Sequence, residues 1–369
     1  MTHRVRHSQA CYRILNLDIC LASDSRPLME AFDRDYGWFR VPFLNGTKRL
    51  TFSVHINTGK APAVIATRVF NRQSSIVNRQ SLLAHPSPVS YALQLMVRTL
   101  FSELTDFIVL HAGVVEEDGR ALILSGPPGV GKSTLTLGLL KRGFRFLSDD
   151  FCPIARSTGQ VHPFPRTVWV VDPSRTKAPA SGRPGKRPIS PDQLPGGICE
   201  SPCIPGWLIC LDPGKKAGHI QLECALKEEG EEAFVRELSQ MEGVTLARPR
   251  PDLPEWHIHY PPGQGISPLM RETIARHRDH IWNIYRSDRA SPDFEKMPAI
   301  KPLSCHEATL RLLGELKQDP QFLTRKTVGH RKAGAFFVEL AGLLEGVACY
   351  RLTPGRLDEM IGLIRERVG

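Results

Sequence analysis

The sequence lacks long apolar segments, nucleic-acid-binding motifs and a signal peptide. No stretch approaches the roughly 18 apolar residues that a membrane helix needs, and Met1 to Ala10 is polar and rich in His and Arg. It has no zinc finger, RNP-type aromatic motif or basic helix, and aromatic residues make up only 7% of the chain. We therefore expect a cytoplasmic protein that binds neither membranes nor nucleic acid.

The cysteines show no spacing typical of a disulfide framework or a zinc site. There are 9, and only Cys199 and Cys203 lie close together, without a second pair or a nearby histidine. This pattern is typical of free thiols in a reducing compartment.

Length and composition indicate a core-forming protein of two domains. The chain has 369 residues, of which 41% are hydrophobic and 23% charged, and its formal net charge is +10. The basic balance permits acidic partners without identifying one. We expect a small N-terminal α+β domain at 1–88 and a second domain at 89–369, with an insertion at about 247–300 where prolines and charges interrupt the pattern.

Periodicity places elements on either side of this boundary. Alternating residues predict strands at 12–23, 50–56 and 64–70 and a short helix at 25–33 in the N-terminal part. A helical pattern follows at 90–104. Two apolar runs, 107–115 and 121–125, flank Asp118-Gly119, which predicts a β-hairpin.

The second strand of that hairpin leads into a glycine-rich loop with the pattern G-x-x-x-x-G-K-[ST]. The loop consists of Gly126, Pro127, Pro128, Gly129, Val130, Gly131, Lys132, Ser133 and Thr134. Glycines let its backbone amides turn inward around a polyphosphate, and the helix that begins near Lys132 directs its positive end at the same group. A strand before the loop and a helix after it are the context that a P-loop requires, so we predict nucleotide binding.

The loop chemistry indicates ATP and Mg²⁺. Lys132 supplies a charge at the β- and γ-phosphates, and the Ser133 hydroxyl is suited to ligate Mg²⁺. The next strand, 144–148, ends in Asp149-Asp150. Successive side chains of an extended chain point to opposite sides, so one carboxylate can face a metal and the other an incoming hydroxyl. The alternative is a solvated turn that caps the next element.

Two further residues have open interpretations. His111 lies in an apolar strand beside the P-loop strand, where it is either a hydrogen-bonded core histidine or part of the site. Arg166, between Pro165 and a predicted strand, either contacts substrate or phosphate or is an exposed loop residue. The basic, proline- and glycine-rich segment 177–197 is interpreted as a loop that can cover a phosphate site.

A family resemblance joins these features. The order His111-Ala112-Gly113-Val114, P-loop, Lys141-Arg142-Gly143-Phe144 and Leu147-Ser148-Asp149-Asp150 resembles the catalytic core of HPr kinase/phosphorylase. It is more similar still to the HPr-kinase-related proteins of bacterial gene clusters, including those that phosphorylate a serine of lasso-peptide precursors. The resemblance covers roughly residues 107–152. Pro127-Pro128 departs from it, because that family has an Asp-Ser type pair there.

The resemblance implies an α/β P-loop kinase domain of the HPr kinase C-terminal type. It also implies that His111 supports the acidic pair, that Asp149 is the base toward a serine hydroxyl, and that Asp150 holds Mg²⁺ with Ser133. Lys132 would stabilise the transferring phosphoryl group.

The expected activity is transfer of the γ-phosphoryl group of ATP to a serine of a peptide or small protein, such as a ribosomal peptide precursor. A homo-oligomer is compatible with this. Two alternatives remain: a kinase for a small-molecule hydroxyl, such as free serine or a sugar, and a non-catalytic nucleotide-dependent regulator.

Overall fold

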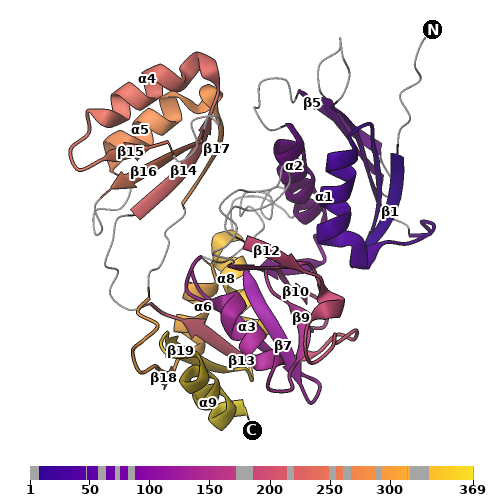
Figure 1. Cartoon of the computed structure of the whole chain (residues 1–369), viewed down its shortest axis with the longest axis vertical. Coiled ribbons are helices and arrows are strands. Elements are labelled where there is room, and N and C mark those ends of the chain that lie inside the picture. Colours follow the sequence, from indigo (N-terminus) through magenta and orange to yellow (C-terminus); the bar gives the residue numbers. More distant parts are fainter. Residues whose placement is uncertain are drawn as a thin grey trace.

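The computed structural model describes most of the chain as three units that each contain a β-sheet (Figure 1). The described residues are 8–46, 48–56, 64–70, 75–81, 88–171, 186–213, 220–248, 255–260, 267–286, 292–313, 315 and 332–368. Within these residues, no helix is long and apolar enough to cross a membrane.

The N-terminal unit is a five-stranded sheet with two helices, and its strands follow one another in chain order. Its elements are β1 (Ser8–Ile14), β2 (Leu17–Ser23), α1 (Arg26–Tyr36), the short 3-10 helix η1 (Gly37–Phe39), β3 (Arg49–His55), β4 (Val64–Phe70), β5 (Ser75–Ser81) and α2 (Pro88–Glu103). The Ser25 hydroxyl accepts a hydrogen bond from the Leu28 amide and caps α1. The single strand predicted at 12–23 is wrong. Leu15, with φ 56°, turns the chain so that β1 and β2 form an antiparallel hairpin.

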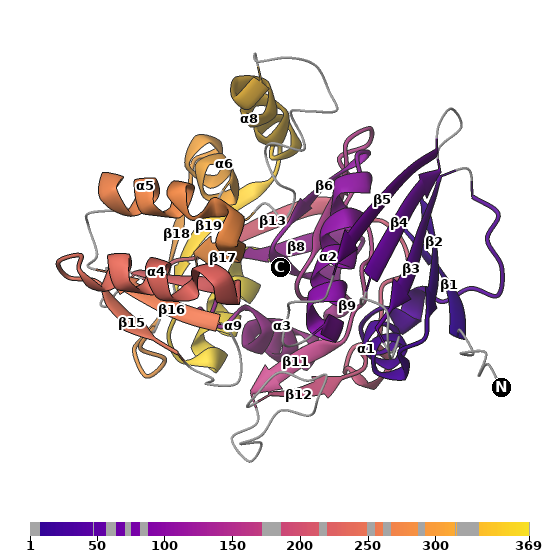
Figure 2. The same cartoon turned by 90° about the horizontal axis from the view of Figure 1, so that it is seen from above.

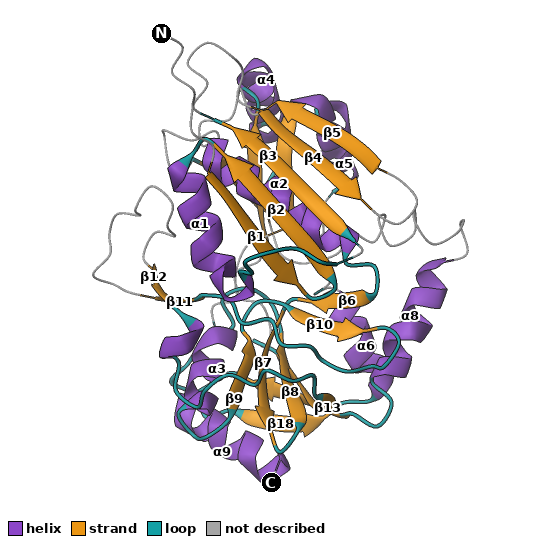
Figure 3. Cartoon of the chain, turned by 90° about the vertical axis from the view of Figure 1, so that its right-hand side faces the viewer, coloured by secondary structure: helices purple, strands orange, loops and turns teal. Residues whose placement is uncertain are grey.

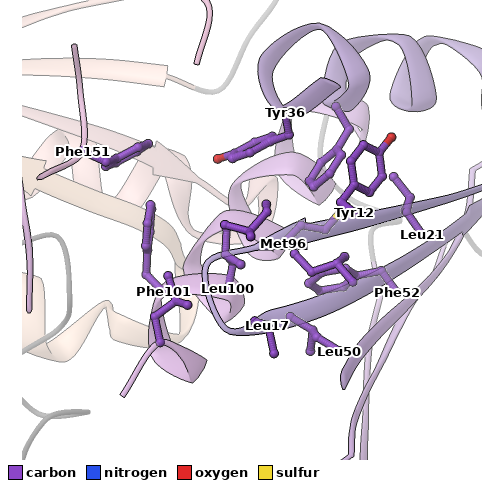
Figure 4. Packing of buried hydrophobic residues seen from close by; sticks show 14 of the residues in the cluster. Tyr12, Leu17, Leu21, Tyr36, Leu50, Phe52, Met96, Leu100, Phe101 and Phe151 are labelled. Atoms are coloured by element: carbon purple, nitrogen blue, oxygen red, sulfur yellow. The ribbon is translucent and has the colours of Figure 1, made fainter. Parts of the chain in front are cut away.

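One apolar core joins this unit to the next. Met96 and Leu100 of α2 pack with Tyr12 and Phe52 of the sheet, and Phe101 turns toward Phe151 of the following unit (Figure 4). The domain division expected at residue 88 falls at the start of α2. The buried face of this helix packs on the N-terminal sheet. Side chains from both sides of residue 88 therefore belong to one hydrophobic core.

The central unit is an α/β sheet of six strands in the order β18-β19-β13-β8-β7-β9. Its elements are β6 (Phe107–Leu110), β7 (Ala112–Glu117), β8 (Arg120–Ser125), α3 (Lys132–Leu140), β9 (Arg145–Ser148), β10 (Cys152–Ala155), β13 (Ile204–Leu211), β18 (Ala299–Pro302), α6 (Cys305–Leu313), α8 (Lys332–Leu343), β19 (Ala348–Thr353) and α9 (Leu357–Val368). The hairpin predicted at Asp118-Gly119 is confirmed as β7 and β8. Strand β10 pairs with β6 in a separate small sheet.

Alternation along β8 explains why helices cover both faces of the central sheet. Leu122 and Leu124 belong to the core beneath α3 and α9, whereas Ala121 and Ile123 belong to the core beneath α6 and α8. Strands β8, β13 and β19 run parallel, so their carboxyl ends lie at one edge of the sheet. Ligands of open α/β sheets bind at this edge.

A further hairpin connects the central and N-terminal units. It consists of β11 (Val168–Val171) and β12 (Lys186–Ile189), and the 3-10 helix η2 (Pro191–Gln193) follows it. The expectation of a loop throughout 177–197 is therefore wrong for its second half, because residues 186–189 pair with β11. Residues 177–185 lie outside the described part of the chain. Figure 2 shows this hairpin close to α1.

The third unit has the strand-helix-strand-strand-helix-strand order of ferredoxin-like folds. It comprises β14 (Ile220–Leu226), α4 (Glu228–Ser239), β15 (Thr245–Ala247), β16 (Glu255–Tyr260), α5 (Pro268–Arg276), the 3-10 helix η3 (Arg278–His280) and β17 (Ile281–Arg286). It has its own core around Phe234 and Ile258, and Figure 1 shows it set apart from the central sheet. The insertion expected at about 247–300 overlaps this unit, which begins earlier, at residue 220.

Phe164 is the aromatic residue on which the junction of the first two units converges. Its ring centroid lies 5.0 Å from that of Phe39 and 5.7 Å from that of Phe151, and the side chain is fully buried. We expect Phe164→Ala to lower the free energy of unfolding by about 3–5 kcal/mol, measured by urea denaturation. Phe43→Ala is the matched control, since that ring is 67% exposed. Equal losses in the two variants would contradict this packing.

Candidate active site

The loop between β8 and α3 forms a cradle that requires glycine. Gly126, Gly129 and Gly131 have φ values of 149°, 82° and 97°, which other residues rarely adopt. A Cβ on Gly126 would lie 2.7 Å from the Leu211 carbonyl oxygen of the neighbouring strand. The cradle therefore depends on close contact with β13 as well as on backbone freedom.

Lys132 reaches back across the cradle from the first turn of α3. The side chain is mostly buried, and its ammonium donates hydrogen bonds to the carbonyl oxygens of Gly126, at 2.5 Å, and Pro127, at 3.3 Å. Gly131 precedes the helix in a left-handed conformation and is its N-cap. The positive charge and the positive end of α3 are thus held at the same place.

Asp149 lies beside the start of α3. Its Oδ2 accepts a hydrogen bond from the Ser133 hydroxyl at 2.8 Å, while Oδ1 is buried without a hydrogen-bond partner among the described residues. Burial, and secondarily the neighbouring Asp150 carboxylate, raises the pKa of Asp149 to about 6. The Ser133 hydrogen bond and the charges of Lys132 and His111 lower it and only partly offset that rise.

Asp150, the next residue, contacts two basic groups. Its Oδ1 lies 3.2 Å from His111 Nε2, and its Oδ2 lies 3.7 Å from Arg166 Nη1. The other ring nitrogen of His111, Nδ1, lies 3.2 Å from Glu315 Oε2, and the His111 amide donates to the Glu315 carbonyl. The imidazole is thus fixed between two carboxylates.

The segment His111-Ala112-Gly113 is held against α3 by close packing. His111 occupies the break between β6 and β7. A Cβ on Gly113 would lie 2.6 Å from the Thr136 hydroxyl of α3, so only glycine permits this approach. Because His111 lies only two residues before Gly113, this contact also holds the imidazole close to the acidic pair.

Arg166 belongs to a contact between units. It is only 8% exposed, and its guanidinium lies between the rings of Tyr36, at 4.6 Å, and Phe151, at 4.7 Å. Its Nη2 lies 3.2 Å from Asp35 Oδ2 of α1. Arg166 therefore connects the N-terminal unit to Asp150.

A cavity of about 860 Å³ opens over these groups. His111, Lys132, Ser133, Asp149 and Asp150 line one end. The groove continues along α3 between the β11–β12 hairpin and α9, where its walls include Leu137, Val170, Leu357 and Ile361. Charged side chains, among them Lys141, Arg142 and Lys186, line the cavity as well.

Sequence reasoning did not identify two residues of this site. Glu315, behind His111, lies 204 positions further along the chain. Phe294, 43% exposed, lines the cavity near Gly131 and comes from the segment that returns from the third unit. No local motif marks either residue, because each is defined only by its neighbours in space.

The oxygen donors fit Mg²⁺ better than a metal that needs a full set of protein ligands. No group of three or more His, Cys, Asp or Glu residues that could hold a metal occurs among the described residues. Mg²⁺ keeps several waters and takes one or two carboxylates together with phosphate oxygens. The Ser133 hydroxyl and the Asp150 carboxylate, which line the same cavity, are such donors.

The strand, glycine cradle, inward lysine and helix, followed by two acidic residues at the end of the next strand, have the arrangement expected of a P-loop on an α/β fold. No family model matches the chain. The chain is similar to HPr kinase/phosphorylases, which confirms the resemblance seen in the motifs.

Three relatives illustrate this similarity. Identity is 29% over 100 residues with the HPr kinase/phosphorylase of Thermoanaerobacter sp. (strain X514), covering 26% of this chain and 33% of the relative. It is 31% over 107 residues with that of Exiguobacterium sibiricum, covering 28% and 34%. It is 40% over 64 residues with that of Treponema pallidum (strain Nichols), covering 17% and 20%. The chain thus matches about a third or less of each relative's length.

The raised pKa of Asp149 predicts a pH-dependent effect on stability. Because the folded-state pKa, about 6, exceeds the ordinary value of 3.8, the folded protein loses stability as the pH rises through this window. Asp149→Asn removes this loss. Relative to the parent protein, the free energy of unfolding of the variant should rise between about pH 4 and pH 6 and stay higher above pH 6. The maximum difference is about 3 kcal/mol, at about 1.4 kcal/mol per pKa unit.

Denaturation midpoints of the two proteins from pH 4 to pH 8 measure this difference. Asp118→Asn is the control, since that carboxylate lies exposed in the β7–β8 turn. A stability difference for Asp149→Asn that does not change with pH would show that the carboxyl titrates normally.

Proposed function

We propose that the protein transfers the γ-phosphoryl group of ATP to a serine hydroxyl of a peptide or small protein, such as a ribosomal peptide precursor. The observation that carries this proposal is the hydrogen bond from Ser133 to Asp149, at 2.8 Å. It places the acidic strand end within reach of the phosphate cradle. The similarity to HPr kinase/phosphorylases supports the same reaction class.

The cradle would bind the triphosphate. The amides of residues 126 to 134 and the N-terminus of α3 favour negative charge, and Lys132 would exchange its carbonyl partners for phosphate oxygens. Ser133 and Asp150 would hold Mg²⁺, which supplies neutralisation of charge on the phosphoryl oxygens. Asp149 would lie next to this Mg²⁺, because it accepts a hydrogen bond from Ser133.

Asp149 would act as the base. A carboxyl with a pKa near 6 is a better proton acceptor near neutral pH than an ordinary aspartate. The serine oxygen forms a bond to the γ-phosphorus, the bond from that phosphorus to the β–γ bridging oxygen breaks, and the serine proton passes to Asp149. ADP leaves with the bridging oxygen. His111, held by Glu315, would position Asp150 during this exchange.

Variants of the two aspartates test the division of roles. With γ-labelled ATP and a library of serine-containing peptides, we expect Asp149→Asn to lower transfer by about 100-fold or more while MgATP affinity stays within a few-fold. Asp150→Asn should weaken the Mg²⁺ dependence of nucleotide binding. Parental transfer by Asp149→Asn would overturn the assignment of the base.

A Lys132 variant tests nucleotide binding, and a change of acceptor tests the substrate class. Lys132→Met should abolish detectable nucleotide binding in calorimetry, and Lys301→Met, on the exposed surface of β18, should leave it unchanged. Transfer to free serine at the rate seen with peptides would indicate a small-molecule kinase. Nucleotide binding without acceptor-dependent ADP release would indicate a regulator.

A further inference from the structure

A second cavity, of about 510 Å³, lies between the N-terminal unit and the β11–β12 hairpin. One wall is the end of α1 with η1, and the other is formed by residues 165 to 167, β12 and η2. Figure 3 shows α1 beside this hairpin, above the central sheet. The cavity is therefore built by two units, and neither forms it alone.

This second cavity adjoins the candidate active site. Thr167 lines both cavities, and its hydroxyl donates to the Arg34 carbonyl of α1. Asp35, on the wall of the second cavity, and Asp150, in the first, contact the same Arg166 guanidinium. The two cavities are therefore neighbours that share Thr167 as a lining residue.

The lining combines apolar surfaces with charged side chains. Arg34 also lines the cavity, with its Nε 3.7 Å from Asp35 Oδ1. Trp38 is 46% exposed, and Pro165, Pro188 and Pro191 supply further apolar walls. Asp33 is paired with Arg40 and Asp35 with Arg166. Asp192, exposed on η2, forms no ion pair with the described residues and only accepts a hydrogen bond from the Ser190 hydroxyl.

These features match a cationic side chain. The aliphatic part of a lysine or arginine can lie along an indole and proline surface, and its charge interacts with the indole face and a carboxylate. We propose that this cavity binds a lysine or arginine side chain of the acceptor polypeptide, close in sequence to the acceptor serine. The inference rests on the proposed kinase activity and names its acceptor class.

The position of the basic residue follows from chain geometry. An extended chain advances roughly 3.3–3.6 Å per residue, and the two cavities share a wall. The basic residue should therefore lie within about four positions of the serine.

A peptide series tests the proposal. It carries one central serine and a single lysine moved through the four positions on either side, with a glutamate series and an alanine series as comparisons. With γ-labelled ATP we expect a preference of about tenfold in kcat/KM for lysine at one position. Trp38→Ala and Asp192→Asn should each raise the KM for that peptide several-fold and leave the KM for ATP unchanged.

Charge reversal separates recognition from structural support. Asp192→Lys should transfer the preference from the lysine peptide to the glutamate peptide, which a purely structural role of Asp192 would not do. Glu229→Lys, an exposed acid on α4 of the third unit, is the matched control and should keep the lysine preference. Unfolding midpoints close to the parental value exclude loss of structure as the cause.

The other outcomes of the peptide assay distinguish failure of the subsite proposal from failure of the kinase proposal. Phosphorylation of all peptides without a basic preference, or an unchanged preference in Asp192→Lys, overturns the subsite and leaves the kinase proposal intact. A preference for alanine over both charged residues would identify an apolar pocket instead. MgATP binding without phosphorylation of any peptide overturns both proposals.

Discussion

The close approach of the glycine loop to β13 and of α3 to β7 is the constraint on which the rest of the site depends. Gly126 brings the cradle against the Leu211 carbonyl, and Gly113 brings β7 against Thr136. These two contacts leave no room for a side chain. They place Ser133 within hydrogen-bond distance of Asp149 and His111 beside Asp150. A methyl group added at either glycine would displace its neighbour and disturb both pairs, because a packed interior has no space for the extra volume.

The two adjacent aspartates differ because of their surroundings. Asp149 lies beside the Ser133 hydroxyl with its Oδ1 buried and unpartnered among the described residues, whereas Asp150 contacts His111 and Arg166. The two residues follow the end of β9 in a bend and line the same cavity, where they contact different partners. The acid pair therefore combines one carboxylate that has a free oxygen among the described residues with one that contacts two basic side chains.

The N-terminal unit is joined to the central unit by a shared hydrophobic core and by ion pairs. Its α2 shares a core with Phe151 and Phe164, and its Asp35 meets the guanidinium that contacts Asp150. Phe164 and Arg166, two positions apart, thus connect this unit to the site by apolar packing and by charge. This short path links α1 and α2 to the acidic pair.

The local elements of the site could be predicted from residue chemistry alone. Glycine spacing, Lys132, Ser133 and the strand ending in Asp149-Asp150 could be read from residue chemistry, because a phosphate cradle needs those residue types in that order. The turn in the N-terminal hairpin was missed because Leu15, a residue with no turn preference, adopts a positive φ. Only the tertiary structure brought Glu315, Asp35 and Phe294 to the site and built the second cavity from two units. Such contacts join distant segments, and their free energy comes from packing and charge pairing that no local pattern encodes.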